Sequence, residues 1–192
     1  NFIEKKQIKN LFKIAIKNKI LKIDTSPAYG NSEKIIGKIK CSKLRILTKI
    51  PKIPKKIKKK NLSKWVLKKV ENSLKDLNVK KVYCILVQNP KILLTTKGKI
   101  IYNTLQNLKA KKIIKKIGVS IYDYKFLERI LKNYQIDLVQ APLNVLDKRL
   151  IETGWLKKLK KQKVEVHARS LFLQGVLLLK SEKLPKKLNK LK

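Results

Sequence analysis

The stretch ILKIDTSPAYGNSEKIIGK, residues 20–38, joins a short apolar run to a polar loop. The run Ile20–Ile23 is typical of a strand and ends on Asp24, and the following loop of Pro, Gly, Asn and Ser carries Tyr29. Because Tyr29 follows Asp24 by only five residues, a short loop can return both side chains to the same edge of a sheet. The stretch therefore predicts a buried strand whose carboxyl end carries a polar pair capable of chemistry.

The same alternation of strand-like and helix-like segments continues along the chain. Five further strand-like runs lie at residues 44–49, 82–88, 115–120, 137–140 and 164–170. Lysine-rich amphipathic segments lie at 61–77, 99–112 and 124–134. In the first of these, apolar residues such as Leu62, Val66 and Val70 recur at helical spacing. This order predicts an α/β fold with parallel strands and right-handed crossovers, either a doubly wound sheet or a (β/α)8 TIM barrel.

The residues that end the strand-like runs distinguish these two architectures. Each run ends on a group that can do chemistry or donate a hydrogen bond: Asp24, Lys49, Gln88, Ser120, Gln140 and Arg169. In a parallel barrel the carboxyl ends of all strands lie on one face, so these side chains would surround a single pocket. No GxGxxG follows the first strand, which weakens the dinucleotide-binding doubly wound alternative. We therefore favour the barrel.

The composition limits the classes of partner. The 192 residues carry a formal net charge of +38, yet only four of the 50 basic residues are arginine, and aromatic residues make up 6%. Nucleic-acid readers rely on arginine forks and aromatic stacking, so we expect no specific nucleic-acid partner. The lysine-heavy residues 51–60 are expected to form a solvated loop. The high contents of lysine, isoleucine and asparagine are typical of a protein encoded by an AT-rich genome. From the positive charge we expect only a weak, non-specific attraction to polyanions.

Cysteine and histidine offer no metal centre. Cys41 and Cys84 lie 43 residues apart with no further ligand at metal-binding spacing, so neither a disulfide framework nor a metal site is expected, and a reducing cytoplasm fits best. His167, the only histidine, is expected to be a satisfied barrel residue on the same side of its strand as Arg169. No apolar run approaches a membrane span of about 20 residues, and no signal peptide opens the sequence, so we expect no membrane partner.

The motifs together resemble those of the aldo/keto reductase family. IDTSPAYGNSEKIIGK, residues 23–38, resembles the signature around the family's catalytic Asp and Tyr. The resemblance continues through LTK, VQNP, IGVSIYD, DLVQAPLNVLDKRL and HARSLFLQGVLLL, in order and over almost the whole chain. It implies a TIM barrel that transfers hydride from NADPH, with NADH as the other candidate, to the carbonyl of a small aldehyde or ketone. The later segments resemble a bacterial subset associated with surface sugars.

The resemblance assigns catalytic roles to three residues. Tyr29 becomes the general acid, Lys49 the cation that stabilises its phenolate, and Asp24 the carboxylate that keeps Lys49 charged and aimed. Taken singly, Asp24 could cap a turn, Tyr29 could pack in a loop and Lys49 could be a surface lysine. Their joint occurrence at the family's spacing favours catalysis.

The fourth catalytic position departs from the family pattern. Where these enzymes usually carry histidine, this chain has Gln88, in VQNP. A glutamine amide can donate a hydrogen bond to a carbonyl oxygen, but it does not titrate near neutral pH or relay a proton. We therefore expect a slowed or altered reductase, with a degenerate, non-catalytic copy as the competing interpretation.

The resemblance also indicates cofactor contacts. Ser120 and Gln140 match positions that bind the nicotinamide carboxamide, although they could instead satisfy backbone groups at strand ends. Ile121 replaces an asparagine that is frequent in the family, which removes one donor. Arg169 falls where many members stack an aromatic ring, and a planar guanidinium can stack as well. The stretch that usually follows the pyrophosphate contains Ser170, Leu171 and Gln174.

The number of strands sets the expected extent of the domain. About six of the eight β/α units of a closed barrel are visible, so residues 1–192 should form a single, incomplete barrel domain. We expect the first strand before Phe2 and the eighth after Lys192. Asn1 begins the sequence and methionine is absent, as in a fragment. Two hypotheses remain: a carbonyl reductase, and a non-catalytic barrel remnant with non-specific affinity for polyanions.

Overall fold

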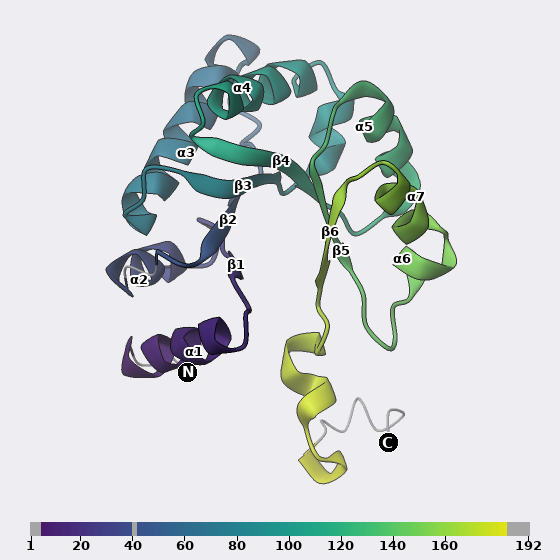
Figure 1. Ribbon diagram of the computed structural model, residues 1–192. Coiled ribbons are helices and arrows are strands. Elements are labelled where there is room, and N and C mark those ends of the chain that lie inside the picture. The colour runs from purple at the N-terminus through teal and green to yellow at the C-terminus, as the bar shows by residue number, and fades with distance from the viewer. Residues whose placement is uncertain (1–4, 40–41, 184–192) are drawn as a thin grey trace.

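The computed structural model of the chain describes residues 5–39 and 42–183. Its strands form one parallel sheet in which the spatial order follows the sequence. They are β1 (Lys22–Asp24), β2 (Arg45–Ile50), β3 (Val82–Val87), β4 (Ile114–Ser120), β5 (Leu138–Pro142) and β6 (Glu165–Arg169). Figure 1 shows this sheet curled into an open half-barrel with helices along its outer side. The predicted α/β fold, with six parallel strands of a TIM-type barrel, is confirmed.

The helices only partly match those predicted. They are α1 (Lys5–Lys17), α2 (Ser32–Ile39), α3 (Leu62–Leu77), α4 (Gly98–Ala110), α5 (Leu127–Asn133), α6 (Arg149–Glu152) and α7 (Trp155–Lys161). Helices α3, α4 and α5 confirm the three amphipathic segments, whereas α1, α2, α6 and α7 were not predicted. Helix α2 begins inside a stretch rich in Gly, Asn and Ser, residue types that ordinarily indicate a loop.

Short 3₁₀ segments complete the connections. They are η1 (Lys59–Asn61), η2 (Pro90–Leu94), η3 (Tyr124–Phe126), η4 (Leu173–Leu178) and η5 (Ser181–Lys183). The predicted loop 51–60 is irregular until it enters η1. Within residues 5–39 and 42–183, no helix is both long and apolar enough to span a bilayer. Cys84 is a buried free thiol, whereas Cys41 and the strands expected before Phe2 and after Lys192 lie outside the described residues.

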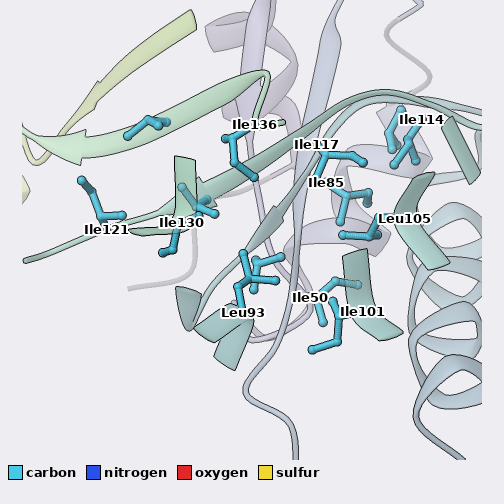
Figure 2. Close-up of a cluster of buried hydrophobic side chains, with 14 of the residues drawn as sticks. Ile50, Ile85, Leu93, Ile101, Leu105, Ile114, Ile117, Ile121, Ile130 and Ile136 are labelled. Carbon is cyan, nitrogen blue, oxygen red and sulfur yellow. The ribbon is translucent and has the colours of Figure 1, made fainter. Parts of the chain in front are cut away.

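The main core lies between the outer face of the sheet and the helices. Figure 2 shows part of it, where Ile85 and Ile117 of neighbouring strands meet Ile101 and Leu105 of α4. All four side chains are almost fully buried, and burial of each contributes about 1.5–3 kcal/mol. The inner face carries a much smaller apolar cluster: Leu47, Cys84, Leu86 and Leu138. The helices are therefore held by the outer face, which leaves the inner face free for polar side chains.

A carboxylate-centred network occupies the inner side near the amino ends of the strands. Glu165 of β6 accepts hydrogen bonds from Lys22, Tyr83 and Lys116, and its Oε1 lies 2.6 Å from Nε2 of His167. Burial alone would raise the pKa of Glu165, but these hydrogen bonds outweigh it and hold that pKa well below its usual value. The expectation that His167 is a satisfied barrel residue is thus confirmed.

Candidate functional site

A chain of hydrogen bonds links four of the predicted strand-end residues. Lys49 Nζ donates to Asp24 Oδ2 at 2.6 Å, and Gln140 Nε2 donates to Asp24 Oδ1 at 3.1 Å. Ser120 Oγ in turn donates to Gln140 Oε1 at 3.0 Å. Ser120 and Gln140 are register partners on β4 and β5, so they lie side by side. The curl of the sheet therefore joins β1 and β2 to β4 and β5 at their carboxyl ends.

Lys49 is the most buried charge in this network. Its side chain is 2% exposed, against 37% for that of Asp24. Besides the carboxylate, Nζ donates to the backbone carbonyl of Thr25 at 3.0 Å. A buried ammonium is costly unless it is paired and hydrogen-bonded. These two acceptors therefore compensate the ammonium and fix its direction, and the Thr25 carbonyl is a contact that the sequence motifs did not identify.

Tyr29 lies in the tight turn that follows β1. Its backbone N–H donates to the Ser26 carbonyl at 3.0 Å, and its carbonyl accepts from Ser32 N–H at 3.1 Å. The tyrosine ring is half exposed, and Lys49 Nζ lies 4.8 Å from its centroid. The ammonium is thus within the range of a cation–π contact. Asp24, Lys49 and Tyr29 therefore lie together at the open end of the half-barrel, with the ring facing solvent.

Gln88 follows the carboxyl end of β3. Its backbone N–H donates to the Ile50 carbonyl at 3.3 Å, which holds the residue beside the end of β2. The side-chain oxygen Oε1 is buried and has no hydrogen-bond partner among the described residues. A buried amide oxygen without a donor is unfavourable. The side chain is therefore suited to accept a hydrogen bond from an incoming hydroxyl group.

Arg169, at the end of β6, already stacks on a protein ring. Its guanidinium carbon lies 3.6 Å from the centroid of Tyr122, and one terminal nitrogen donates to the Ile121 carbonyl at 3.2 Å. Its Nε is buried and lacks a partner within the part of the chain that the structure describes. Tyr122 was not among the predicted site residues. No sequence signal identifies it, because its exposure and its contact with Arg169 both arise from the fold.

The segment after β6 is separate from the hydrogen-bonded network. Ser170 and Gln174 adopt left-handed backbone conformations, with φ of 59° and 57°. The Ser170 carbonyl accepts from Asn144 Nδ2 at 3.1 Å, which ties the segment to the loop after β5. Leu171 is exposed. Across residues 5–39 and 42–183, no hydrogen bond joins Ser170, Leu171 or Gln174 to Asp24 or Lys49, although all of them follow strand carboxyl ends.

One protein-family model matches the chain over its whole given length. Residues 1–192 match the family model described as "Aldo/keto reductase family". No match was found among curated protein sequences.

Solved structures show the same fold. An aldo-keto reductase from Bacillus halodurans, in its apo form, aligns with a TM-score of 0.73 and 18% identity, covering 92% of this chain and 59% of that one. The thermostable aldo-keto reductase Tm1743, in complex with the inhibitor epalrestat, aligns at 0.72 and 27% identity, covering 95% and 67%. A glycerol dehydrogenase from Gluconobacter oxydans aligns at 0.69 and 23% identity, covering 91% and 55%. The chain thus spans 55% to 67% of the length of these structures.

Proposed function

This chain belongs to the aldo/keto reductase family, and from that membership we propose that it reduces a small aldehyde or ketone to an alcohol in the cytoplasm. NADPH is the proposed hydride source, with NADH as the alternative, and sugar intermediates are one candidate class of substrate. The observation that carries the proposal is the contact of the Lys49 ammonium with both the Asp24 carboxylate and the Tyr29 ring.

Tyr29 is the proposed general acid. Reduction places negative charge on the former carbonyl oxygen, and a phenol beside it can deliver the proton that completes the alcohol. The Lys49 ammonium stabilises the resulting phenolate, because opposite charges attract strongly where water is scarce. Asp24 and the Thr25 carbonyl keep the ammonium in place through hydrogen bonds of 2.6 and 3.0 Å.

Gln88 is proposed to orient the substrate. Its amide nitrogen can donate to the carbonyl oxygen, and its unpartnered Oε1 can accept from the hydroxyl of the alcohol. An amide binds both states without changing its own protonation. Gln88 therefore contributes orientation, while the proton must come from Tyr29.

The residues at the mouth of the half-barrel fit a nicotinamide cofactor. Ser120 and Gln140 carry a hydroxyl and an amide at adjacent strand ends, where Ser120 is bonded to Gln140 and Gln140 to Asp24. The buried Arg169 Nε lacks a partner among the described residues. We propose that Ser120 and Gln140 bind the carboxamide and that Arg169 holds the ring. Ser170, Leu171 and Gln174 would follow the pyrophosphate. When bound, the cofactor supplies the hydride.

Replacement of Tyr29 by phenylalanine tests this proposal. We expect Tyr29→Phe to slow carbonyl reduction by about 10²–10⁴-fold, because the proton donor is lost. Quenching of NADPH fluorescence should still report cofactor binding, since the proposed binding residues are intact. The assay is NADPH oxidation with a panel of small aldehydes and sugar aldehydes. Tyr102→Phe, the same change on helix α4 of the outer layer, is the control and should keep the wild-type rate. Equal rates for the wild type and Tyr29→Phe would contradict the assignment.

One observation favours a second candidate function. Gln88 stands where the family usually has histidine, a change that a degenerate, non-catalytic barrel remnant would tolerate. The chain's net charge of +38 would then lead it to bind polyanions non-specifically. The two candidates differ in cofactor binding. Saturable NADPH binding by the folded chain supports the reductase, whereas a folded chain that neither binds NADPH nor reduces any aldehyde supports the remnant.

A further inference from the structure

A cavity of about 770 Å³ lies at the opposite end of the strands from Tyr29. Three neighbouring strands begin at it, because Arg45 of β2, Val82 of β3 and Ile114 of β4 all line it. Arg45 precedes Lys49 by four residues on the same strand, which separates the cavity from the proposed catalytic lysine by roughly 13 Å at the rise of a β-strand. The cavity is therefore distinct from the carbonyl-reducing site.

The cavity is lined by six cationic residues, of which Lys109 alone forms an ion pair among the described residues. Its cationic residues are Arg45, Lys80, Lys81, Lys109, Lys112 and Lys115, and no carboxylate is among the described residues that line it. Lys109 is paired with Asp137 at 2.6 Å, and the Arg45 guanidinium lies over the ring of Tyr83. The other four lysines form no ion pair within residues 5–39 and 42–183. Cations around one concave space repel one another, so this arrangement favours an anion between them.

The remaining walls are apolar and limit the kind of anion. Side chains of Leu44, Ile46, Val79, Val82 and Ile114 line the same space. A volume near 770 Å³ falls in the range of small-molecule pockets, about 300–1,000 Å³. Nucleic acid is favoured less, because Tyr83 is the one aromatic residue among the described residues on these walls, and Arg45 already lies over its ring. Lysine binds phosphate as a flexible point charge.

We propose that this cavity is a second binding site, which takes a small phosphate-bearing polyanion such as a pyrophosphate or a phosphate ester. Lys81 directly precedes β3, Lys112 lies in the turn before β4, and Lys115 is the second residue of β4. All three line the cavity from the starts of two adjacent strands. Lys112 adopts a left-handed backbone conformation, with φ of 57°, in the turn between α4 and β4. The site is independent of the proposed carbonyl reduction.

The test is calorimetric titration of the chain with inorganic pyrophosphate at about 150 mM salt, where surface attraction beyond roughly 8 Å is screened. We expect one saturable site per chain. The triple variant Lys81→Gln, Lys112→Gln, Lys115→Gln should bind at least about tenfold more weakly, since each charged hydrogen bond contributes that order. The matched control Lys157→Gln, Lys160→Gln, Lys161→Gln removes the same charge from α7, where these three of its four lysines are exposed, and should bind as the wild type does.

Several results would overturn the proposal. Equal weakening in both triple variants would mean that only net charge matters. Stoichiometry well above one, or displacement of pyrophosphate by single-stranded DNA with no difference between the variants, would indicate non-specific polyanion binding. Displacement by saturating NADPH would assign the anion to the cofactor site instead. Circular dichroism of both variants is the check that they are folded, so that a loss of binding reports on the cavity.

Discussion

Asp24 and Lys49 form an asymmetric pair at the residue scale. The lysine side chain is 2% exposed and the aspartate side chain 37%, so the ammonium is shielded from water whereas the carboxylate is partly hydrated. The Asp24 carboxylate also receives Gln140 Nε2 and can be hydrated at its open side. Loss of either partner should end catalysis, but the two losses should affect stability differently.

We predict that Asp24→Asn lowers the free energy of unfolding by about 3–5 kcal/mol, because it leaves a buried ammonium without a counter-charge. Lys49→Met removes the buried charge itself and should change that free energy by less than about 1.5 kcal/mol. Urea denaturation followed by circular dichroism measures both. The opposite order would show that Asp24, and not Lys49, is the buried charge that needs compensation.

Sequence motifs predicted which residues lie together where a strand end fixes their position. Asp24, Lys49, Ser120 and Gln140 were selected as strand-end residues, and the structure joins them by hydrogen bonds. Tyr122 was missed, because its role depends on Arg169, 47 residues later in the sequence, folding back over its ring. A contact of that kind has no local pattern.

At the scale of elements, the helices differ in how they are held. Helices α3, α4 and α5 present apolar stripes to the sheet, which is the signal that sequence periodicity detects. Helix α2 is short and packs instead through a glycine against the end of α3. A Cβ at Gly37 would lie 2.3 Å from the backbone oxygen of Asp76. The close approach of the two helices thus depends on the missing side chain.

Gly37→Ala should therefore destabilise the protein by about 1–3 kcal/mol, although alanine is the better helix former, because backbone atoms of α3 cannot move aside cheaply. Lys38→Ala, at the exposed neighbouring position of the same helix, is the control and should change the midpoint of thermal unfolding little. Scanning calorimetry compares the two variants. A stabilised Gly37→Ala variant would mean that α2 and α3 separate without cost.

At the scale of the whole molecule, Glu165 connects the two ends of the sheet. It lies on β6, yet it binds Lys22 of β1, which precedes it by 143 residues. Lys116 and Tyr83 of the middle strands share the same carboxylate. A single acidic side chain therefore ties four strands together across the inner side of the half-barrel, where no helix packs.

Replacement of Glu165 by glutamine should lower the free energy of unfolding by about 3–5 kcal/mol at neutral pH, because clustered cations lose their counter-charge. The folded-state pKa of Glu165 lies well below its ordinary value of 4.5. The network thus contributes fully above about pH 4.5, and this stability is lost as the pH falls further. Glu165→Gln should therefore flatten the acid limb of the stability curve.

The alkaline side has the opposite sign. Burial alone would lower the pKa of Lys116, but its hydrogen bonds to Glu165 and Tyr83 raise it above the ordinary value of 10.5. The contribution of Lys116 to stability is complete below that pH and declines above it.

Glu152→Gln, at an exposed carboxylate on α6, is the control for Glu165→Gln in denaturant titrations across the acid range. If it flattened the acid limb as much as Glu165→Gln does, the network would not be the cause.

The sequence by itself determined the alternation of strands and helices, the parallel order of the sheet and the polar residues at the carboxyl ends of the strands. Periodicity, turn residues and strand-end chemistry are local, and family motifs record them in order along the chain. Tertiary structure alone decided which of these residues touch. The Gln140–Asp24 hydrogen bond, the Arg169–Tyr122 stack, the Glu165 network and the lysine-lined cavity depend on strand register and on the curl of the sheet. Curl and register arise from packing between residues far apart in the sequence, so no local pattern records them.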